Sequence, residues 1–122
     1  MISHIMLPVS NYQKSKEFYS KALAPVGYSS DTDYGDSCGF NDGTSVDFWI
    51  AQKETVVPMH VAFKAGSKQA VEGFYEAAVN AGGTDNGKPG YRDYGPGYYA
   101  AFAFDPDGHN IEANWIDTSK AE

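Results

Sequence analysis

The sequence predicts an α+β fold built from two βαβββ modules, with helices covering the strands. Two observations predict it: an internal repeat, and apolar patterns that alternate between a period of two and a period near 3.6 within each half. His4-Ile5 opens an apolar run that is followed fourteen residues later by Phe18-Tyr19. His60-Val61 opens another, and Phe74-Tyr75 follows at the same spacing. The halves are therefore two copies of one unit, in which His60 is the counterpart of His4.

Each half contains one amphipathic helix after its first strand. A capping box of Ser10 and Gln13 is expected to open the first helix, and Pro25 to end it. Ser67 is the candidate cap of the second helix, which should end before Gly82. The apolar stripes of the two helices are Tyr19, Ala22, Leu23 and Val26, and Val71, Phe74, Tyr75, Ala78 and Val79.

Two Asp-Gly pairs, at 42–43 and 107–108, predict tight turns before the last strand of each half. They are further apart in the sequence than His4 and His60 are, so the second half should carry a longer middle loop. That loop is expected at 83–97, where five Gly and two Pro interrupt any regular pattern.

The chain of 122 residues is expected to form a single domain over residues 1–118. Module one should span about 1–52 and module two about 58–117, with a tail at 119–122. A net charge of −7 and a pI near 4.7 argue against nucleic acid or a membrane surface as partner, so a small molecule is the expected ligand. No export signal or long apolar run is visible, and we expect a cytoplasmic protein. The lone Cys38 is expected to be an apolar filler.

Strand alternation sorts the side chains into two faces. If the helices cover the face carrying Ile5 and Ile111, then His4, His60 and Glu112 all point to the opposite, concave face. Imidazoles and carboxylates are costly to desolvate unless a divalent cation compensates them. The sequence therefore predicts a metal site with His4, His60 and Glu112 as ligands, for Ni, Zn, Co, Mn or Fe.

Asp47 is a further candidate, because it lies four residues after its turn glycine, as Glu112 does. It is expected to bind the ion, to reach it through water, or to act as a base. His109 is expected to be an exposed turn residue. The same face should carry Met6, Trp49, Asn110 and Asn114. The substrate-binding candidates are Trp49, Arg92, Tyr94, Tyr98 and Asn114, with Tyr99 also flanking the Gly/Pro-rich loop.

Over nearly its whole length the chain resembles the vicinal oxygen chelate superfamily of glyoxalases, bleomycin-resistance proteins and extradiol dioxygenases. The resemblance is carried by residues 4–9, 15–19 and 60–63, and most specifically by Phe104-Asp-Pro-Asp-Gly-His-Asn-Ile-Glu112. It implies a cup-shaped mixed sheet and a metal held by His4, His60 and Glu112. The chain is most similar to small lactoylglutathione lyase-like proteins. Those enzymes have Glu at the place of Asp47 and an Arg on the first strand, where this chain offers Pro8.

Three functions follow from these features. The first is a metal-dependent lyase or isomerase in which the ion stabilises an enediolate and Glu112 or Asp47 moves a proton. The second is an Fe(II) extradiol-type dioxygenase with a two-His, one-carboxylate triad. The third is a metal-free protein that binds a small molecule, as bleomycin-resistance proteins do. By resemblance we expect a homodimer, in which the cup is closed within one chain or shared between two.

Overall fold

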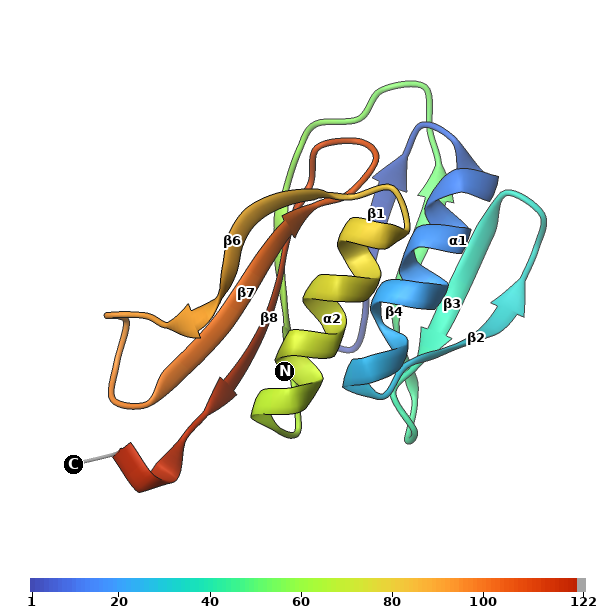
Figure 1. The fold of residues 1–122 in the computed structure, drawn as a ribbon. Coiled ribbons are helices and arrows are strands. Elements are labelled where there is room, and N and C mark those ends of the chain that lie inside the picture. The colour runs from blue at the N-terminus through green and yellow to red at the C-terminus, as the bar shows by residue number, and fades with distance from the viewer. Residues whose placement is uncertain (121–122) are drawn as a thin grey trace.

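The computed structural model describes residues 1–120 as two four-stranded mixed sheets, each accompanied by one long helix (Figure 1). Module one comprises β1 (Ile5–Val9), α1 (Tyr12–Ala22), a 3-10 turn (Ala24–Val26), β2 (Ser29–Asp33), β3 (Ser37–Asn41) and β4 (Val46–Gln52). Module two comprises β5 (His60–Lys64), α2 (Lys68–Asn80), β6 (Thr84–Tyr91), β7 (Tyr98–Phe104) and β8 (Asn110–Ile116), followed by a 3-10 turn (Thr118–Lys120). The strand orders, β1-β4-β3-β2 and β5-β8-β7-β6, are the same, which confirms the predicted pair of βαβββ modules. Part of the predicted tail, residues 121–122, lies outside the described residues.

The first and last strands of both modules pair in parallel with the same register. Ile5 is opposite Phe48, and Val61 is opposite Ile111. Since Val61 is the counterpart of Ile5 in the repeat, Ile111 on β8 is the counterpart of Phe48 on β4. Counting from the two turn glycines would instead align Ile111 with Val46. The spacing between the Asp-Gly pairs therefore does not carry over to the strands that follow them.

The two helices begin at different kinds of cap. Ser67 caps α2, as predicted. The predicted capping box at Ser10 is wrong, because Asn11 caps α1, while the Ser10 amide and hydroxyl donate to Asp107 in the turn before β8. α1 ends at Ala22, before Pro25, which is the second residue of the 3-10 turn. Among the described residues no helix is long and apolar enough to span a membrane.

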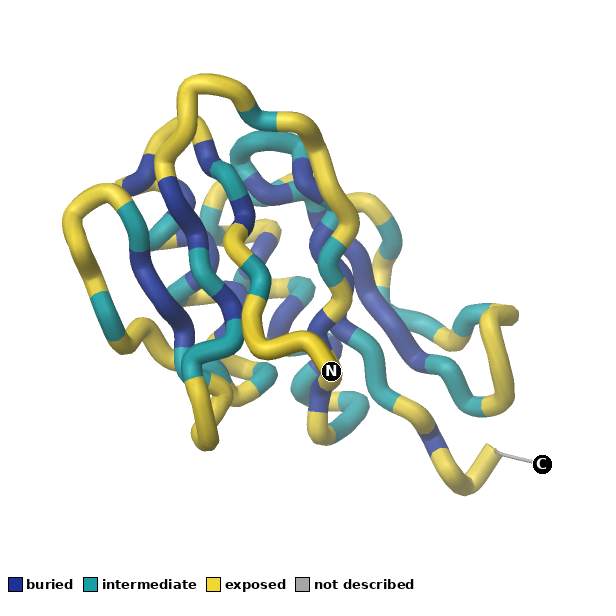
Figure 2. The backbone as a smooth tube through the Cα atoms, turned by 180° about the vertical axis from the view of Figure 1, so that it is seen from behind, coloured by how far each residue is buried: buried dark blue, intermediate teal, exposed yellow. Residues whose placement is uncertain are grey.

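Both helices lie side by side on one side of the sheets and share one core with them (Figure 1). The largest fully buried side chains are Tyr19, Phe18, Phe40, Phe48, Phe74, Leu7, Leu23, Ile50 and Ile111. The Phe48 and Phe63 rings meet edge to face at 5.0 Å and so join the modules. The opposite side of the sheets, seen in Figure 2, is here called the open face.

β1 and β5 lie beside each other in the middle of the molecule and run in opposite directions (Figure 1). At one end of this seam the fully buried His109 holds the modules together. Its Nδ1 accepts from the Met59 amide at 2.9 Å, and its Nε2 donates to the Pro8 carbonyl at 2.8 Å. The expectation that His109 is exposed is wrong, because the chain after the turn glycine enters the seam rather than the solvent.

The region 83–97, expected to be largely a loop, contains the edge strand β6. Its pairing with β7 shifts register between Asp85 and Gly87 and again between Gly87 and Gly90. An edge strand tolerates Pro89 and such bulges, because one side of its backbone needs no partner. Pro and Gly in this segment therefore bend the strand without preventing it.

Candidate metal centre

Glu112 is a buried carboxylate on the open face of module two. Ile111 and Ala113 point into the core, so the intervening Glu112 side chain points to the other side of β8. Its Oε1 lies 2.8 Å from Nε2 of His60 on the neighbouring strand. The Glu112 side chain is only 4% exposed, whereas that of His60 is 52% exposed. The pair therefore presents an imidazole to the open face above a sequestered carboxylate.

Tyr98 and Asn114 hold the second oxygen of this carboxylate. The Tyr98 hydroxyl donates to Oε2 of Glu112, and the Asn114 amide donates to the same oxygen at 3.1 Å and to the Tyr98 hydroxyl at 3.0 Å. Burial, together with the bond to Glu112, raises the pKa of Tyr98 to about 12, so the phenol keeps its proton at neutral pH. Both residues were predicted to contact substrate, which stays a prediction; the structure places them beside the carboxylate as partners of its Oε2. They fix the orientation of Glu112 and leave Oε1 toward His60.

Arg92 lies on the same face, above the ring of Phe102. The guanidinium is 5.4 Å from the Phe102 centroid, and that ring is 6.2 Å from the His60 ring. Its amino groups donate to the carbonyls of Gly90 and Lys88 at 2.9 and 2.7 Å. A side chain on Gly90 would crowd the guanidinium at 3.1 Å, so this glycine lets Arg92 fold back over its own strand. Sequence reasoning missed Phe102, which alternation along β7 places beside Glu112.

The other two tyrosines near the loop, Tyr94 and Tyr99, lie in different surroundings. Tyr94 is 66% exposed and packs its ring against the edge of Tyr98 at 5.3 Å. Tyr99 is buried on the core side, where its hydroxyl donates to Glu72 of α2 at 2.7 Å. Only Tyr94 therefore remains available at the rim of the site.

His4 lies at the far end of the seam from His60. Because β1 and β5 run in opposite directions, Pro8 lies at the His60 end, and His4 is four residues away, on the order of 13 Å along a strand. Ser3 is its hydrogen-bond partner, at 3.2 Å. Within one chain, then, the structure brings His60 and Glu112 together and leaves His4 apart.

Asp47 is displaced from the predicted position by a β-bulge. Phe48 is opposite Phe40, but the next pair is Val46 with Asn41, so Asp47 is an extra residue in β4. Its carboxylate lies beside Tyr28, where burial and this neighbour raise the pKa of the phenol well above its ordinary value. The Oδ1 atom is buried without a hydrogen-bond partner. Asp47 is not the structural counterpart of Glu112, because alternation does not continue through a bulge.

Trp49 occupies the position in module one that Glu112 occupies in module two. Met6 is opposite Trp49, and Ala62, the counterpart of Met6 in the repeat, is opposite Glu112. Each module thus has one histidine at or just before its first strand, His4 or His60. At the position of Glu112, however, module one has Trp49, so the carboxylate occurs in module two alone.

Asp105, Asp107 and His109 form a compact group within residues 1–120, but their atoms are already engaged. Asp105 accepts from the Tyr19 hydroxyl at 2.6 Å and from the amides of Asp107 and His109. Asp107 accepts from Ser10, and both nitrogens of His109 bind backbone atoms. These three side chains therefore stabilise the turn before β8.

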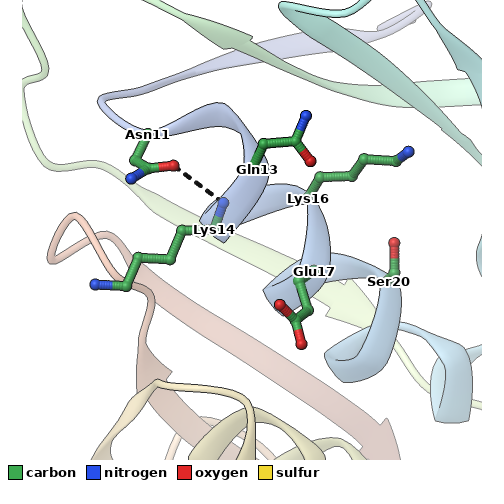
Figure 3. Close-up of a pocket in the computed structure, with 6 residues that line it drawn as sticks. All are labelled: Asn11, Gln13, Lys14, Lys16, Glu17 and Ser20. Atoms are coloured by element: carbon green, nitrogen blue, oxygen red, sulfur yellow. Dashed lines mark hydrogen bonds between the residues drawn. The ribbon is translucent and has the colours of Figure 1, made fainter.

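Two hollows on the described part of the chain lie away from this pair. One, of about 590 Å³, lies along the solvent side of α1, where the side chains of a single helix diverge into solvent (Figure 3). The other, of about 250 Å³, lies at the His4 end of the seam between Asp47, Tyr28 and Lys64. Neither contains His60 or Glu112. The His60 side chain, 52% exposed, instead opens the candidate metal centre to the open face.

His60 and Glu112 fit a divalent ion, but they supply only part of the ligands that it needs. An imidazole nitrogen and a carboxylate oxygen lie side by side, and the carboxylate is oriented by two further donors, as metal ligands commonly are. Zn, Fe, Ni and Co all accept this pair of ligand types. Further ligands must come from elsewhere, since His4 lies at the other end of the seam.

The chain belongs to the Glyoxalase/Bleomycin resistance protein/Dioxygenase superfamily, which it matches over residues 1–113. Comparison with curated proteins found no match.

Solved structures share the fold. The chain is similar to a glyoxalase/bleomycin resistance protein from Albidiferax ferrireducens T118, with a TM-score of 0.80 and 26% identity over 94% of this chain and 98% of that one. It is also similar to a family enzyme from Burkholderia phytofirmans PsJN (TM-score 0.74, 17% identity, 95% and 98% covered). A third similar structure is the fosfomycin resistance protein FosX from Mesorhizobium loti (TM-score 0.72, 16% identity, 98% and 94% covered). Of the three names only that of the fosfomycin resistance protein states a particular function, so the likeness establishes the fold and leaves the reaction to the site.

Proposed function

We propose that the protein is a metal-dependent lyase or isomerase of the glyoxalase type that acts on a small oxygenated substrate. The observation that carries the proposal is the His60–Glu112 pair, in which the buried carboxylate is held by Tyr98 and Asn114 while the imidazole stays exposed. A carboxylate that is oriented by hydrogen bonds from neighbouring side chains and lies beside an imidazole is an arrangement common among metal ligands.

The site is completed in this proposal by a second copy of the chain. Leu7 and Val9 of β1 point into the core, so alternation continued back to His4 places it on the open face with His60, at the opposite end of an antiparallel seam. If the open faces of two copies meet around a two-fold axis, the His4 end of one chain can face the His60 end of the other. The homodimer would then hold two ions, each by His60 and Glu112 of one copy and His4 of its partner.

The other roles in the proposed reaction are assigned to side chains of the protein. When bound, the ion would polarise adjacent oxygens of the substrate as a Lewis acid. Glu112 Oε1 would accept and return a proton next to the carbonyl, while Tyr98 and Asn114 hold Oε2 and keep the carboxylate in place. Arg92 and Tyr94 would bind polar groups at the rim. Asp47 would act as a base only if the bulge in β4 turned it toward the open face.

The experiment is a complementation test of metal content. We expect the protein as purified to retain a divalent ion, and both His60→Ala and His4→Ala to lose it. Mixing and refolding equal amounts of the two variants should restore about a quarter of the sites, because about half of the dimers are mixed and one of the two sites in a mixed dimer regains both histidines. Tyr91→Phe is the control, since its hydroxyl binds Asp117 away from the site. Full metal content in His60→Ala would eliminate the proposal, and no recovery in the mixture would eliminate the shared site.

A second candidate is an Fe(II) extradiol-type dioxygenase. It is favoured by Trp49, which replaces a second carboxylate and leaves two histidines and one carboxylate as the ligand set. Oxygen uptake by anaerobically Fe(II)-loaded protein with a catechol identifies this activity. Isomerisation without oxygen uptake supports the lyase or isomerase instead.

A further inference from the structure

The hollow at the His4 end of the seam, here called the seam hollow, is lined by both modules. Its volume is about 250 Å³. Ile5 and Phe48 line it from module one, and Val61 and Phe63 line it from module two. An apolar cavity of roughly 150 Å³ is already large enough for benzene. The seam hollow can therefore take an apolar group of that size together with a polar head group.

The apolar wall of the seam hollow is held in place by aromatic packing. The Phe63 ring meets the Phe48 ring edge to face at 5.0 Å and the Tyr28 ring edge to face at 5.4 Å. Phe48 and Phe63 are buried in the core, whereas Ile5 and Val61 are only half-buried. The wall is thus rigid, and part of its apolar surface is left for a ligand to cover.

Asp47 gives the seam hollow a carboxylate oxygen that has no partner. The bulge in β4 places this side chain in the lining, beside Tyr28. Its Oδ1 is buried and accepts no hydrogen bond. A buried carboxylate oxygen without a donor is costly, and a ligand N–H that reached it would recover that free energy. Asp47 therefore favours a ligand that carries a hydrogen-bond donor, and most strongly a cationic one.

Lys64 supplies the opposite charge from module two. It is the last residue of β5, it is exposed, and it lines the same hollow. Within residues 1–120 neither Asp47 nor Lys64 takes part in an ion pair. The seam hollow thus combines an apolar wall with two unpaired charges of opposite sign. A complementary molecule carries a cationic donor, an anionic group and a small apolar group.

We propose that the seam hollow binds a free α-amino acid with an apolar side chain. The ammonium group donates to Oδ1 of Asp47, the carboxylate pairs with Lys64, and the side chain lies against the apolar wall. Ligand sites are common where two structural units meet, as the modules do here. Because the ligand contacts both modules, it binds the folded protein alone and stabilises it. The candidate metal centre lies at the other end of the seam, so this inference does not depend on the proposed function.

The test compares leucine with two analogues that each lack one of its charges. The analogue 4-methylpentanoate has no ammonium group, and 3-methylbutylamine has no carboxylate. The wild-type protein is first stripped of metal, because an amino acid can chelate a divalent ion. By calorimetry L-leucine should give a saturable isotherm at about millimolar concentration, and L-phenylalanine serves as a second probe. Each analogue should bind at least roughly tenfold more weakly than leucine, as expected for loss of one charged contact.

Two variants assign the charges to their residues. Asp47→Asn should weaken leucine binding by roughly tenfold and leave 4-methylpentanoate unchanged, since that analogue has no ammonium group. Lys64→Met should weaken leucine binding to a similar extent and leave 3-methylbutylamine unchanged. Lys53→Met, an exposed lysine outside the seam hollow, is the matched control, and His60→Ala should also bind leucine normally. Urea unfolding verifies that each variant is folded.

Three outcomes would overturn the proposal: no binding of leucine or phenylalanine, binding of leucine no tighter than that of both analogues, or loss of leucine binding in His60→Ala. The last would place the amino acid at the candidate metal centre. The comparison of leucine with its analogues uses wild-type protein, so it decides the matter even if a variant fails to fold. Metal retention in His60→Ala would remove the proposed reaction and leave the leucine measurement valid.

Discussion

The two modules share a backbone and differ in the side chains on their open faces. At one pair of facing positions module one has Gly39 opposite Trp49, and module two has Phe102 opposite Glu112. The bulky side chain has changed strands between the two copies, from the last strand to its neighbour. One module can therefore bury a carboxylate next to a ring, while the other presents a ring with nothing beneath it but backbone.

A second difference lies at the start of the last strand. In module two His109 enters the seam and binds Met59 and Pro8, whereas the strand register makes Val46 its counterpart in module one. The bulge at Asp47 follows directly. Duplication preserved the strand order, which the core requires, and left the ends of the strands free to change.

The largest effect on stability is expected from His109→Ala. The substitution removes the partner of the part-buried Met59 amide and Pro8 carbonyl and opens a cavity, so we expect a loss of about 3 kcal/mol. Val46→Ala, at the equivalent position, should cost about 1 kcal/mol. Urea unfolding of both variants measures the difference. Equal losses would mean that His109 contributes nothing beyond volume.

The next effect concerns the hydrogen bond that supports the carboxylate in module two. Tyr98→Phe removes the hydroxyl that holds Glu112 Oε2, and metal affinity should fall by roughly 10–100-fold, as when other outer-shell partners are lost. A competition titration with a chelating dye gives the affinity. Tyr91→Phe should keep the wild-type value, and an unchanged affinity in Tyr98→Phe would show that Glu112 needs no such support.

A smaller effect should follow from making module one resemble module two. Trp49→Glu places a second carboxylate at the position equivalent to Glu112 and should tighten metal binding by roughly tenfold, about 1.4 kcal/mol. Val57→Glu, in an exposed segment, controls for added charge. If Asp47 is a ligand after all, Asp47→Asn will release the metal while Trp49→Glu changes little.

The smallest expected effect is on the dependence of folding stability on pH. In module one Asp33 accepts from Lys16 at 2.6 Å and Tyr12 at 2.5 Å, and these donors, with the Gly35 amide, hold the pKa of Asp33 well below its ordinary 3.8. The stabilisation is complete above about pH 4 and is lost as the pH falls further, because the unfolded chain takes up the proton first. Lys68, the counterpart of Tyr12, lies over the rings of Tyr91 and Tyr99, a contact that acid does not alter.

Unfolding midpoints at pH 7 and pH 3 for wild type and Asp33→Asn measure this contribution. The variant should be less stable at pH 7 and should lose less on acidification. Asp36→Asn, an exposed change in the same turn, is the control. A variant that loses as much as wild type between the two pH values would contradict the assignment.

The amino-acid sequence alone was sufficient to predict the two modules, the order of their elements, the Ser67 cap, and the approach of His60 to Glu112. These follow from periodicity and strand alternation, which are local and survive in any protein that buries one face of each strand. The resemblance to the superfamily rested on the same residues.

Which other polar residues meet was set by the packing of the two modules. The bulge at Asp47 depends on pairing with β3, the burial of His109 depends on β1 and β5 running antiparallel, and the separation of His4 from His60 follows from the same seam. The support that Tyr98 and Asn114 give to Glu112 likewise depends on the pairing of β7 with β8. Register and strand direction are set by contacts between distant segments, and no pattern within a single segment encodes them.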